Sequence, residues 1–314
     1  MHILLFFLAA VIAAAGVITE DGAQLLKASE AGGSEGPVWD GKDSLYFTGK
    51  GRIFRLDASG TTHVFREASG GANGLLFDRE RRLVVCEAAN RRVTRTEADG
   101  TITVLAERFA GKKFNSPNDL SMDSKGRIYF SDPRYGNRDS MEMNVEGVYR
   151  IDAPGVVTRV LGRDLVDRPN GVLVSPGDRY LYVADNNNNN TGAARKLWRF
   201  ALRADGTVDG QSRKLIYDWG DGRGPDGIEM DAKGRLVVAG GLNKAQPPHE
   251  TDKSKGGVYV LSTQGKLLEF IPVPLDEVTN VAFGGADLRT LYVSAGGTIW
   301  SIRVKTPGLA PYRR

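Results

Sequence analysis

Cysteine and histidine are scarce in this chain of 314 residues. Cys86 is the single cysteine, so no intrachain disulfide can form, and its place in the apolar run "LVVC" indicates a buried thiol rather than a nucleophile. Only three histidines are present, which disfavours zinc or copper sites built on imidazole and thiolate ligands. A Ser-His-Asp triad is also disfavoured, since only His63 and His249 remain beyond the N-terminus and His63 is expected on an outer strand.

Long apolar runs are missing after the N-terminus. The one candidate, "ILLFFLAAVIAAAG" at residues 3–16, is shorter than the ~20 residues that a bilayer-spanning helix needs and is typical of a signal-peptide core. Small residues at 13–15 favour cleavage there, so we expect residues 1–15 to be a signal peptide and the mature protein to be periplasmic or extracellular. An uncleaved anchor is the alternative, because His2 and the amino terminus are the only cationic groups before the run.

Blocks of like charge are absent as well. The 42 basic and 38 acidic residues are interspersed and give a net charge of +4, without the run of five or six like charges that marks a nucleic-acid-binding arm. We therefore expect no nucleic-acid partner. A composition of 41% hydrophobic and 25% charged residues is that of a globular protein.

A repeat organises the rest of the chain. Each copy has a polar lead residue, an apolar tetrad, a polar turn and a second apolar run that begins 10 or 11 residues after the lead residue. Successive lead residues are 38, 45, 52, 56 and 54 positions apart, a period typical of propellers and solenoids. The six lead residues are Glu35, Asn73, Asn118, Asn170, Asp226 and Asn280.

Every copy continues with a third strand-like segment, and the first five continue with a fourth. The sixth copy lacks the fourth because the chain ends soon after residues 298–302, and "AQLLKAS" at residues 23–29 can supply it. No apolar spacing of three and four favours a helical solenoid. The sequence predicts one all-β domain at residues 20–306, a six-bladed β-propeller closed by pairing its N-terminal strand with the last blade, followed by a tail at 307–314.

The lead residues should meet near the propeller axis, because the first strand of each blade lines the central channel. Antiparallel order then places the loops at residues 131–146 and 240–256, and the loop with the run "NNNNN" at 186–190, on the same face. Loops of this length are commonly functional. Arg134, Tyr135 and His249 on these loops, with Glu87 on a shorter one and Asn73 at the axis, are therefore candidate substrate contacts.

Two carboxylates and four carboxamides near one axis call for a hard cation. Close negative charges are costly without a counterion, and oxygen ligands suit calcium best, with magnesium, manganese or zinc as alternatives. The competing interpretation is structural, since Asn and Asp before Gly are ordinary turn formers. It fits Glu35 least well, and Asn73 and Asn280 best.

The copies "SEGPVW", "SPNDL", "RPNGV" and "GPDGI", taken together, resemble the gluconolactonase, senescence-marker-protein (regucalcin) and luciferin-regenerating-enzyme-like family. The resemblance implies a six-bladed propeller with one divalent metal, whose ligands would be Glu35, Asn170 and Asp226. It makes Asn118 either a fourth ligand or a substrate contact. One departure is Ser116, where the sugar-lactone branch has Arg; this puts glucono-lactone itself in doubt as the substrate.

The expected function is metal-dependent hydrolysis of lactones or related esters. The cation would polarise the carbonyl for attack by water, and Asp226 is the candidate general base, with a metal-bound hydroxide as the alternative nucleophile. An organophosphate or phosphotriester substrate is a second hypothesis. A non-catalytic, metal-stabilised propeller that binds a ligand or docks a protein is a third, because propellers host many functions.

Overall fold

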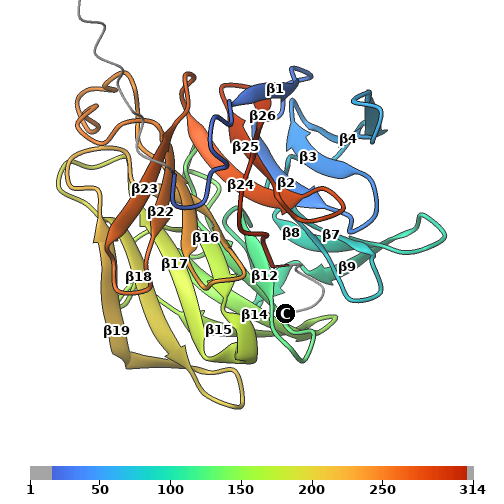
Figure 1. The fold of residues 1–314 in the computed structure, drawn as a ribbon. Coiled ribbons are helices and arrows are strands. Elements are labelled where there is room, and N and C mark those ends of the chain that lie inside the picture. The colour runs from blue at the N-terminus through green and yellow to red at the C-terminus, as the bar shows by residue number, and fades with distance from the viewer. Residues whose placement is uncertain (1–15, 310–314) are drawn as a thin grey trace, which may run out of the picture.

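Six four-stranded antiparallel sheets surround a common axis in the computed structural model, which describes residues 16–309 (Figure 1). The prediction of an all-β, six-bladed propeller is confirmed. Blade 1 holds β2 (Glu35–Trp39), β3 (Leu45–Gly49), β4 (Arg52–Leu56) and β5 (Thr62–Arg66); blade 2 holds β6 (Ala72–Phe77), β7 (Leu83–Glu87), β8 (Arg92–Thr96) and β9 (Ile102–Ala106). Blade 3 holds β12 (Leu120–Met122), β13 (Ile128–Asp132), β14 (Gly147–Ala153) and β15 (Val156–Leu161); blade 4 holds β16 (Pro169–Val174), β17 (Tyr180–Asn186), β18 (Arg195–Leu202) and β19 (Val208–Asp218). Blade 5 holds β20 (Pro225–Met230), β21 (Leu236–Gly240), β22 (Gly257–Leu261) and β23 (Leu267–Pro272).

The last blade is shared between the two ends of the described chain. It pairs β24 (Val278–Gly284), β25 (Thr290–Ala295) and β26 (Thr298–Arg303) with β1 (Leu26–Ser29), in the order β1-β26-β25-β24. The expected ring closure is therefore confirmed, and β26 is covered instead of forming an open edge. A short hairpin of β10 (Arg108–Phe109) and β11 (Lys112–Lys113) and a 3-10 turn, η1 (Pro176–Asp178), complete the elements.

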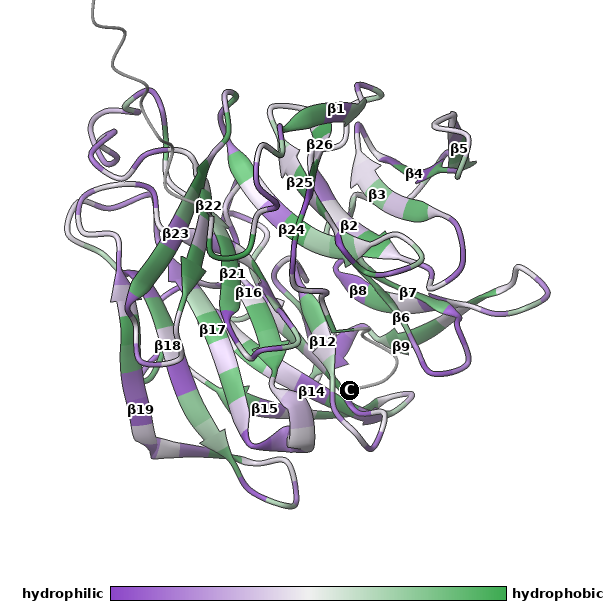
Figure 2. Ribbon diagram, in the orientation of Figure 1, coloured by the Kyte–Doolittle hydropathy of each residue, from purple (hydrophilic) through white to green (hydrophobic). Residues whose placement is uncertain are grey.

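The hydrophobic core lies between the blades. Six clusters of buried apolar side chains each join two neighbouring sheets, so every interface between blades has its own core. In β6, for example, Leu75 and Phe77 pack toward blade 1 and Leu76 packs toward blade 3. Both faces of the inner strands are covered, which explains the nearly continuous apolar tetrads of the repeat. Figure 2 shows the strands as mainly hydrophobic and the connecting loops as mainly hydrophilic.

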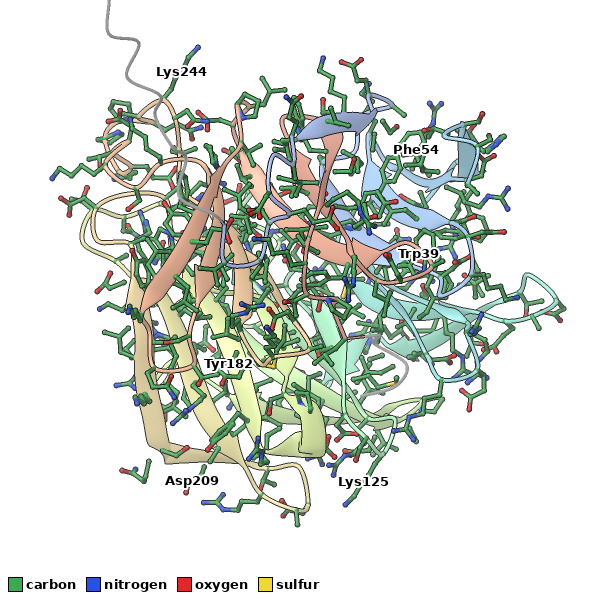
Figure 3. The ribbon with its side chains drawn as sticks, in the orientation of Figure 1. Trp39, Phe54, Lys125, Tyr182, Asp209 and Lys244 are labelled. Carbon is green, nitrogen blue, oxygen red and sulfur yellow. The ribbon has the colours of Figure 1, made fainter. Side chains whose placement is uncertain are left out.

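Outer parts of the blades carry the solvated side chains. Lys125 and Lys244 are exposed and project from the periphery of the molecule (Figure 3). In the described part of the chain, no helix is long and apolar enough to cross a membrane. The expected signal peptide, residues 1–15, lies outside the described residues.

The expected C-terminal tail is described as far as residue 309. Its first residues pack on the propeller: the amide of Gly308 donates to the carbonyl of Leu288, and that of Leu309 donates to the carbonyl of Met230 at 3.3 Å. These contacts join blades 5 and 6 on the side where the first and second strands of each blade connect.

Glycines after the lead residues let the inner strands approach one another closely. A methyl group on Gly171 would overlap the carbonyl oxygen of Asp226, and one on Gly36 would overlap the carbonyl oxygen of Asn73. The repeated Asn-Gly, Asp-Gly and Glu-Gly pairs are thus a packing requirement at the axis, beyond their suitability for turns.

We expect Gly171→Ala to lower the free energy of unfolding by about 1–3 kcal/mol, because the added carbon forces adjacent inner strands apart. Gly136→Ala is the matched control, since a methyl group there meets no atom within 4 Å. Chemical denaturation of both variants checks this. Equal stability of the two would show that the inner strands are not in close contact.

Candidate functional site

The six lead residues form a closed ring at one end of the central channel. Each lies within two residues of the start of the innermost strand of its blade, and in all six blades the second strand begins ten residues after the lead residue. Neighbouring members are linked in turn. Asn280 Nδ2 donates to Glu35 Oε2 at 3.0 Å, and the amide of Gly74 donates to the carbonyl of Asn118 at 2.7 Å.

The remaining links close the ring. Asp119 Oδ2 accepts from the amide of Val172 at 3.0 Å, which ties the third inner strand to the fourth. Gly171 lies against the backbone of Asp226, and Gly227 lies against the side chain of Asn280. The predicted convergence of six segments distant in sequence is thus present in the structure.

Two carboxyl groups in this ring are held in surroundings that disfavour their charge. Burial raises the pKa of Glu35 to about 7, although hydrogen bonds from Asn280 and Gly36 partly oppose the shift. Burial, and then the negative charge of Glu35, raises the pKa of Asp226 well above its ordinary value, while the Arg223 guanidinium opposes the shift. A further positive charge nearby would therefore favour ionisation of both carboxyl groups at neutral pH.

The donor set fits a hard cation. Asp226 Oδ1 and Asn73 Oδ1 are buried acceptors without a hydrogen-bond partner among the described residues. Both hydrogen bonds to the Glu35 carboxylate go to Oε2, from Gly36 and Asn280, so Oε1 accepts none within residues 16–309. Three or more His, Cys, Asp or Glu side chains do not cluster as a metal site anywhere in that range. The ring instead combines two carboxylates with carboxamides, a mixture that calcium accepts and that zinc or copper does not favour.

Asn118 and Asn170 complete the predicted ligand set. Both are buried, at 8% and 5% exposure. The Asn170 side chain lies close to the phenol of Tyr135, and the amide of Asn118 donates to the carbonyl of Ser131 at 3.0 Å. Their role as ligands stays a prediction.

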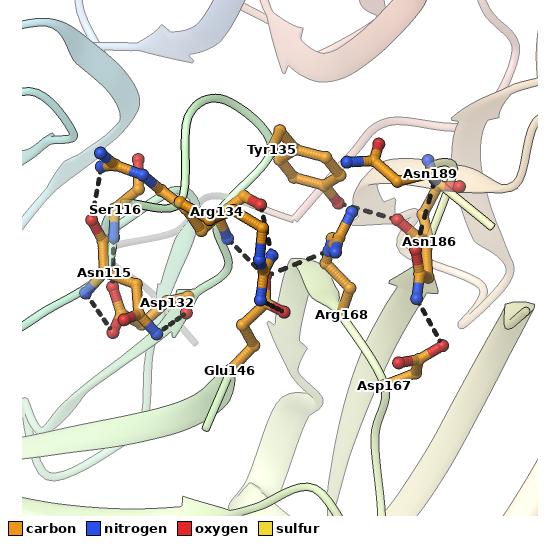
Figure 4. A network of polar contacts seen from close by, with 12 residues as sticks. Asn115, Ser116, Asp132, Arg134, Tyr135, Glu146, Asp167, Arg168, Asn186 and Asn189 are labelled. Carbon is orange, nitrogen blue, oxygen red and sulfur yellow. Dashed lines mark hydrogen bonds and ion pairs between the residues drawn. The ribbon is translucent and has the colours of Figure 1, made fainter. Parts of the chain in front are cut away.

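Tyr135 places the loop between β13 and β14 beside the ring. Its hydroxyl donates to the carbonyl oxygen of Asn186 at 3.1 Å (Figure 4). Burial and the negative charge of Asp226 raise its pKa well above the ordinary value, so the hydroxyl remains protonated. Of the loop residues predicted to contact substrate, Tyr135 has the closest links to the ring.

Arg134 makes hydrogen bonds that hold the β13–β14 loop in place. Its guanidinium donates to the carbonyls of Asn137 at 2.6 Å and Asn115 at 2.9 Å and to Ser140 Oγ at 2.9 Å (Figure 4). This arrangement favours the structural interpretation of Arg134, and substrate contact by this residue stays a prediction.

Glu87 is the last residue of β7, not a loop residue as the sequence suggested. Its carboxylate is 2% exposed and accepts from Arg92 Nε at 2.7 Å, Thr94 Oγ1 at 2.8 Å and Asn90 Nδ2 at 2.7 Å. With both oxygens engaged inside blade 2, Glu87 has a structural role that is independent of any ligand.

His249 joins two loops. Its Nδ1 lies 3.1 Å from Thr191 Oγ1, and its carbonyl accepts from Arg195 Nη2 at 3.3 Å. These contacts connect the β21–β22 loop to the β17–β18 loop on the face that carries the ring. The loops at 131–146, 186–190 and 240–256 therefore gather on one face, as predicted.

Neither described histidine, His63 or His249, forms a hydrogen bond with a serine. Residues 32–36, "GGSEG", have the spacing of a nucleophile elbow, but Ser34 is exposed. His63 lies on the outer strand β5 and pairs with Asp57 at 2.7 Å, and His249 is held by the loop contacts above. Residues 16–309 therefore do not form a Ser-His-Asp triad.

Asn186 was missed by sequence reasoning. It is the first residue of the asparagine run, yet it ends β17, is 0% exposed, and neither side-chain amide atom has a hydrogen-bond partner among the described residues. A methyl group on Gly224 would lie 2.8 Å from Asn186 Oδ1, so this amide lies against the start of β20, the strand that carries Asp226. Only the absence of a side chain at Gly224 hinted at this approach.

The fold and the acid-amide ring define a propeller of the lactonase type, and comparisons with known proteins agree. Residues 33–297 match the sequence model of the SMP-30/Gluconolactonase/LRE-like region, and the chain belongs to this family. It is 29% identical to a gluconolactonase of Zymomonas mobilis, over 90% of this chain and 81% of that protein. It is 26% identical to a pentonolactonase of Haloferax volcanii, over 84% and 81% respectively.

A solved structure of a gluconolactonase from Xanthomonas campestris superposes with a TM-score of 0.76 and 31% identity, covering 90% of both chains. Family membership supports a lactone hydrolase as the class of enzyme.

The raised pKa of Glu35 predicts that the stability of the protein depends on pH when a chelator has removed any bound metal. Because the folded-state pKa of about 7 exceeds the ordinary 4.5, the stabilisation is complete below pH 4.5 and is lost as the pH rises through 7. We expect the melting temperature of the chelated protein to fall between pH 5 and pH 8, and less steeply in Glu35→Gln. Excess calcium should reverse the trend by pairing with the ionised carboxylates.

Scanning calorimetry across this pH range checks the effect, with Glu107→Gln as an exposed control. The same slope for Glu35→Gln and wild type would contradict the assigned surroundings of Glu35.

Proposed function

We propose that this protein is an exported, calcium-dependent lactonase that opens cyclic esters to hydroxy acids. The observation that carries the proposal is the pair of carboxyl groups, half-buried Glu35 and buried Asp226, in a ring of carboxamides with unpartnered acceptor oxygens. The gathering of three loops over this ring, and membership of a lactonase-type family, support a small-molecule substrate there.

Glu35, Asn170 and Asp226 would hold the cation, with Asn118 as a fourth oxygen ligand. When bound, the cation supplies Lewis-acid polarisation of the lactone carbonyl and balances the carboxylate charges. The residues of the ring would chiefly fix the position of the lactone's acyl group. Asn280 keeps Glu35 in place through its 3.0 Å hydrogen bond, and Tyr135 keeps Asn170 in place through its phenol.

Asp226 is the residue proposed to move the proton. Its Oδ1 has no hydrogen-bond partner among residues 16–309 and is available to accept a proton from water. As the water oxygen bonds to the carbonyl carbon, the proton passes to Asp226; as the ring C–O bond breaks, the leaving alkoxide takes a proton back. The product is a hydroxy acid, and no covalent enzyme intermediate is needed.

A phosphotriester is the second candidate substrate, because the same oxygen-rich site suits a phosphoryl oxygen. The buried, charge-disfavouring setting of Asp226 argues for a reacting centre over a purely structural propeller. Substrate panels therefore need both cyclic esters and a phosphotriester.

Asp226→Asn should lower kcat/KM on lactones by at least 10³-fold, because the variant keeps an oxygen ligand and loses the proton acceptor. Asp287→Asn, a change at an exposed carboxylate, is the control. Activity on γ- and δ-lactones should also vanish in chelator and return with added calcium. Full activity of the Asp226 variant or of the metal-free protein would exclude this mechanism.

Tyr135→Phe removes the phenol that links Asn170 to the loop at Asn186. We expect calcium affinity, measured by calorimetry, and kcat/KM each to fall about tenfold, because Asn170, a proposed ligand, loses the neighbour that positions it. Unchanged calcium affinity in this variant would contradict the assigned role of Tyr135.

A further inference from the structure

A polar pocket of about 370 Å³ lies beside the ring, between blades 3 and 4. The β13–β14 loop, the segment between β15 and β16 and the loop after β17 each contribute to its wall. Its charged lining residues are Arg138, Arg163 and Arg168 against Glu146 and Asp167, three positive groups and two negative. Nothing in the proposed mechanism uses this pocket.

The two acids of the pocket are already engaged. Glu146 accepts from Arg138 Nη2 at 2.9 Å and from Arg168 Nε at 3.1 Å, so one carboxylate serves two guanidinium groups (Figure 4). Asp167 accepts from Asn187 Nδ2 at 2.8 Å. Glu146 is thus paired with two guanidinium groups, Asp167 is paired among the described residues only with neutral amides, and the five charged groups leave the pocket one net positive charge.

Two arginines of the pocket have N–H donors that make no hydrogen bond with the described residues. Arg168 is 4% exposed, and its Nη1 is buried without a hydrogen-bond partner in the described part of the chain. Arg163 is exposed at the rim, and its guanidinium has no hydrogen bond or ion pair with any residue from 16 to 309. A buried guanidinium with an unused donor is costly unless a ligand completes its hydrogen bonds.

Arg168 also connects the pocket to the ring. It precedes Asn170 by two positions, so the two lie about 7 Å apart along an extended chain. Its guanidinium carbon lies 5.5 Å from the centre of the Tyr135 ring, and the Tyr135 phenol in turn lies close to the Asn170 side chain. A sugar-sized lactone held at the ring can therefore extend one substituent toward Arg168.

We propose that this pocket binds an acidic substituent of the substrate, so that the preferred substrates are lactones carrying a carboxylate, sulfonate or phosphate. Guanidinium groups bind such oxyanions through paired, charge-assisted hydrogen bonds. A neutral polyol would leave the excess positive charge unpaired. The inference rests on the proposed lactonase function and specifies its substrate class.

The kinetic test uses D-glucono-1,4-lactone and D-glucaro-1,4-lactone, which share a ring and differ in a hydroxymethyl group against a carboxylate. Wild type should prefer the acidic lactone at least tenfold in kcat/KM. Arg168→Gln should lower this preference at least tenfold and Arg163→Gln about threefold, while Arg289→Gln, an exposed arginine on the opposite face, leaves it unchanged. Sulfonate and phosphate analogues at the same carbon identify the preferred anion.

No acidic preference in wild type, or an unchanged preference in both pocket variants, overturns the proposal. Because Arg163 lies exposed at the rim of the pocket, Arg163→Gln tests the proposal even if Arg168→Gln does not fold.

A binding measurement separates this proposal from the proposed reaction. At constant free calcium, D-glucarate should raise the melting temperature of wild type more than D-gluconate does, and Arg163→Gln should reduce the difference. An arginine-dependent shift without hydrolysis of any lactone would support the pocket and refute the lactonase. Hydrolysis without any difference between the two acids would refute the pocket alone.

Discussion

Close approach of six inner strands at one end of the channel is the constraint on which the rest depends. Neighbouring backbones nearly touch at Gly36 and Gly171, and Gly227 lies against the side chain of Asn280, which leaves no room for side chains at those positions. The polar lead residues next to them are consequently brought together. A ring of this kind concentrates carboxyl and carboxamide groups in a small volume, where ionisation of both acids is costly without a compensating positive charge.

The same geometry divides the molecule into a structural and a chemical part. Blade interfaces supply the hydrophobic stability, and each has its own apolar cluster, so the ring does not need to contribute packing. Glu35 and Asp226 are held in surroundings that disfavour their ionisation without a partner cation. Carboxyl groups whose pKa values are raised in this way are typical of sites that bind or transform a ligand.

Sequence reasoning predicted the fold and the ring because both depend on a periodic backbone pattern. The interval of ten residues between lead residue and second strand holds in all six blades, from Glu35 to Leu45 through to Asn280 and Thr290. Side-chain partners in the loops follow no such period. Glu87 was placed on a loop although it ends a strand, and Asn186 was hidden in a low-complexity run, since only the folded loops determine what each side chain contacts.

The central claim is that the acid-amide ring is a cation site, and a crystal structure of the protein grown with millimolar calcium tests it most directly. The account predicts one ion on the axis, with oxygens of Glu35, Asn170 and Asp226 at about 2.3–2.6 Å from it. A crystal structure with no ion at that position, or with these three side chains too far apart to share a coordination sphere, would contradict it.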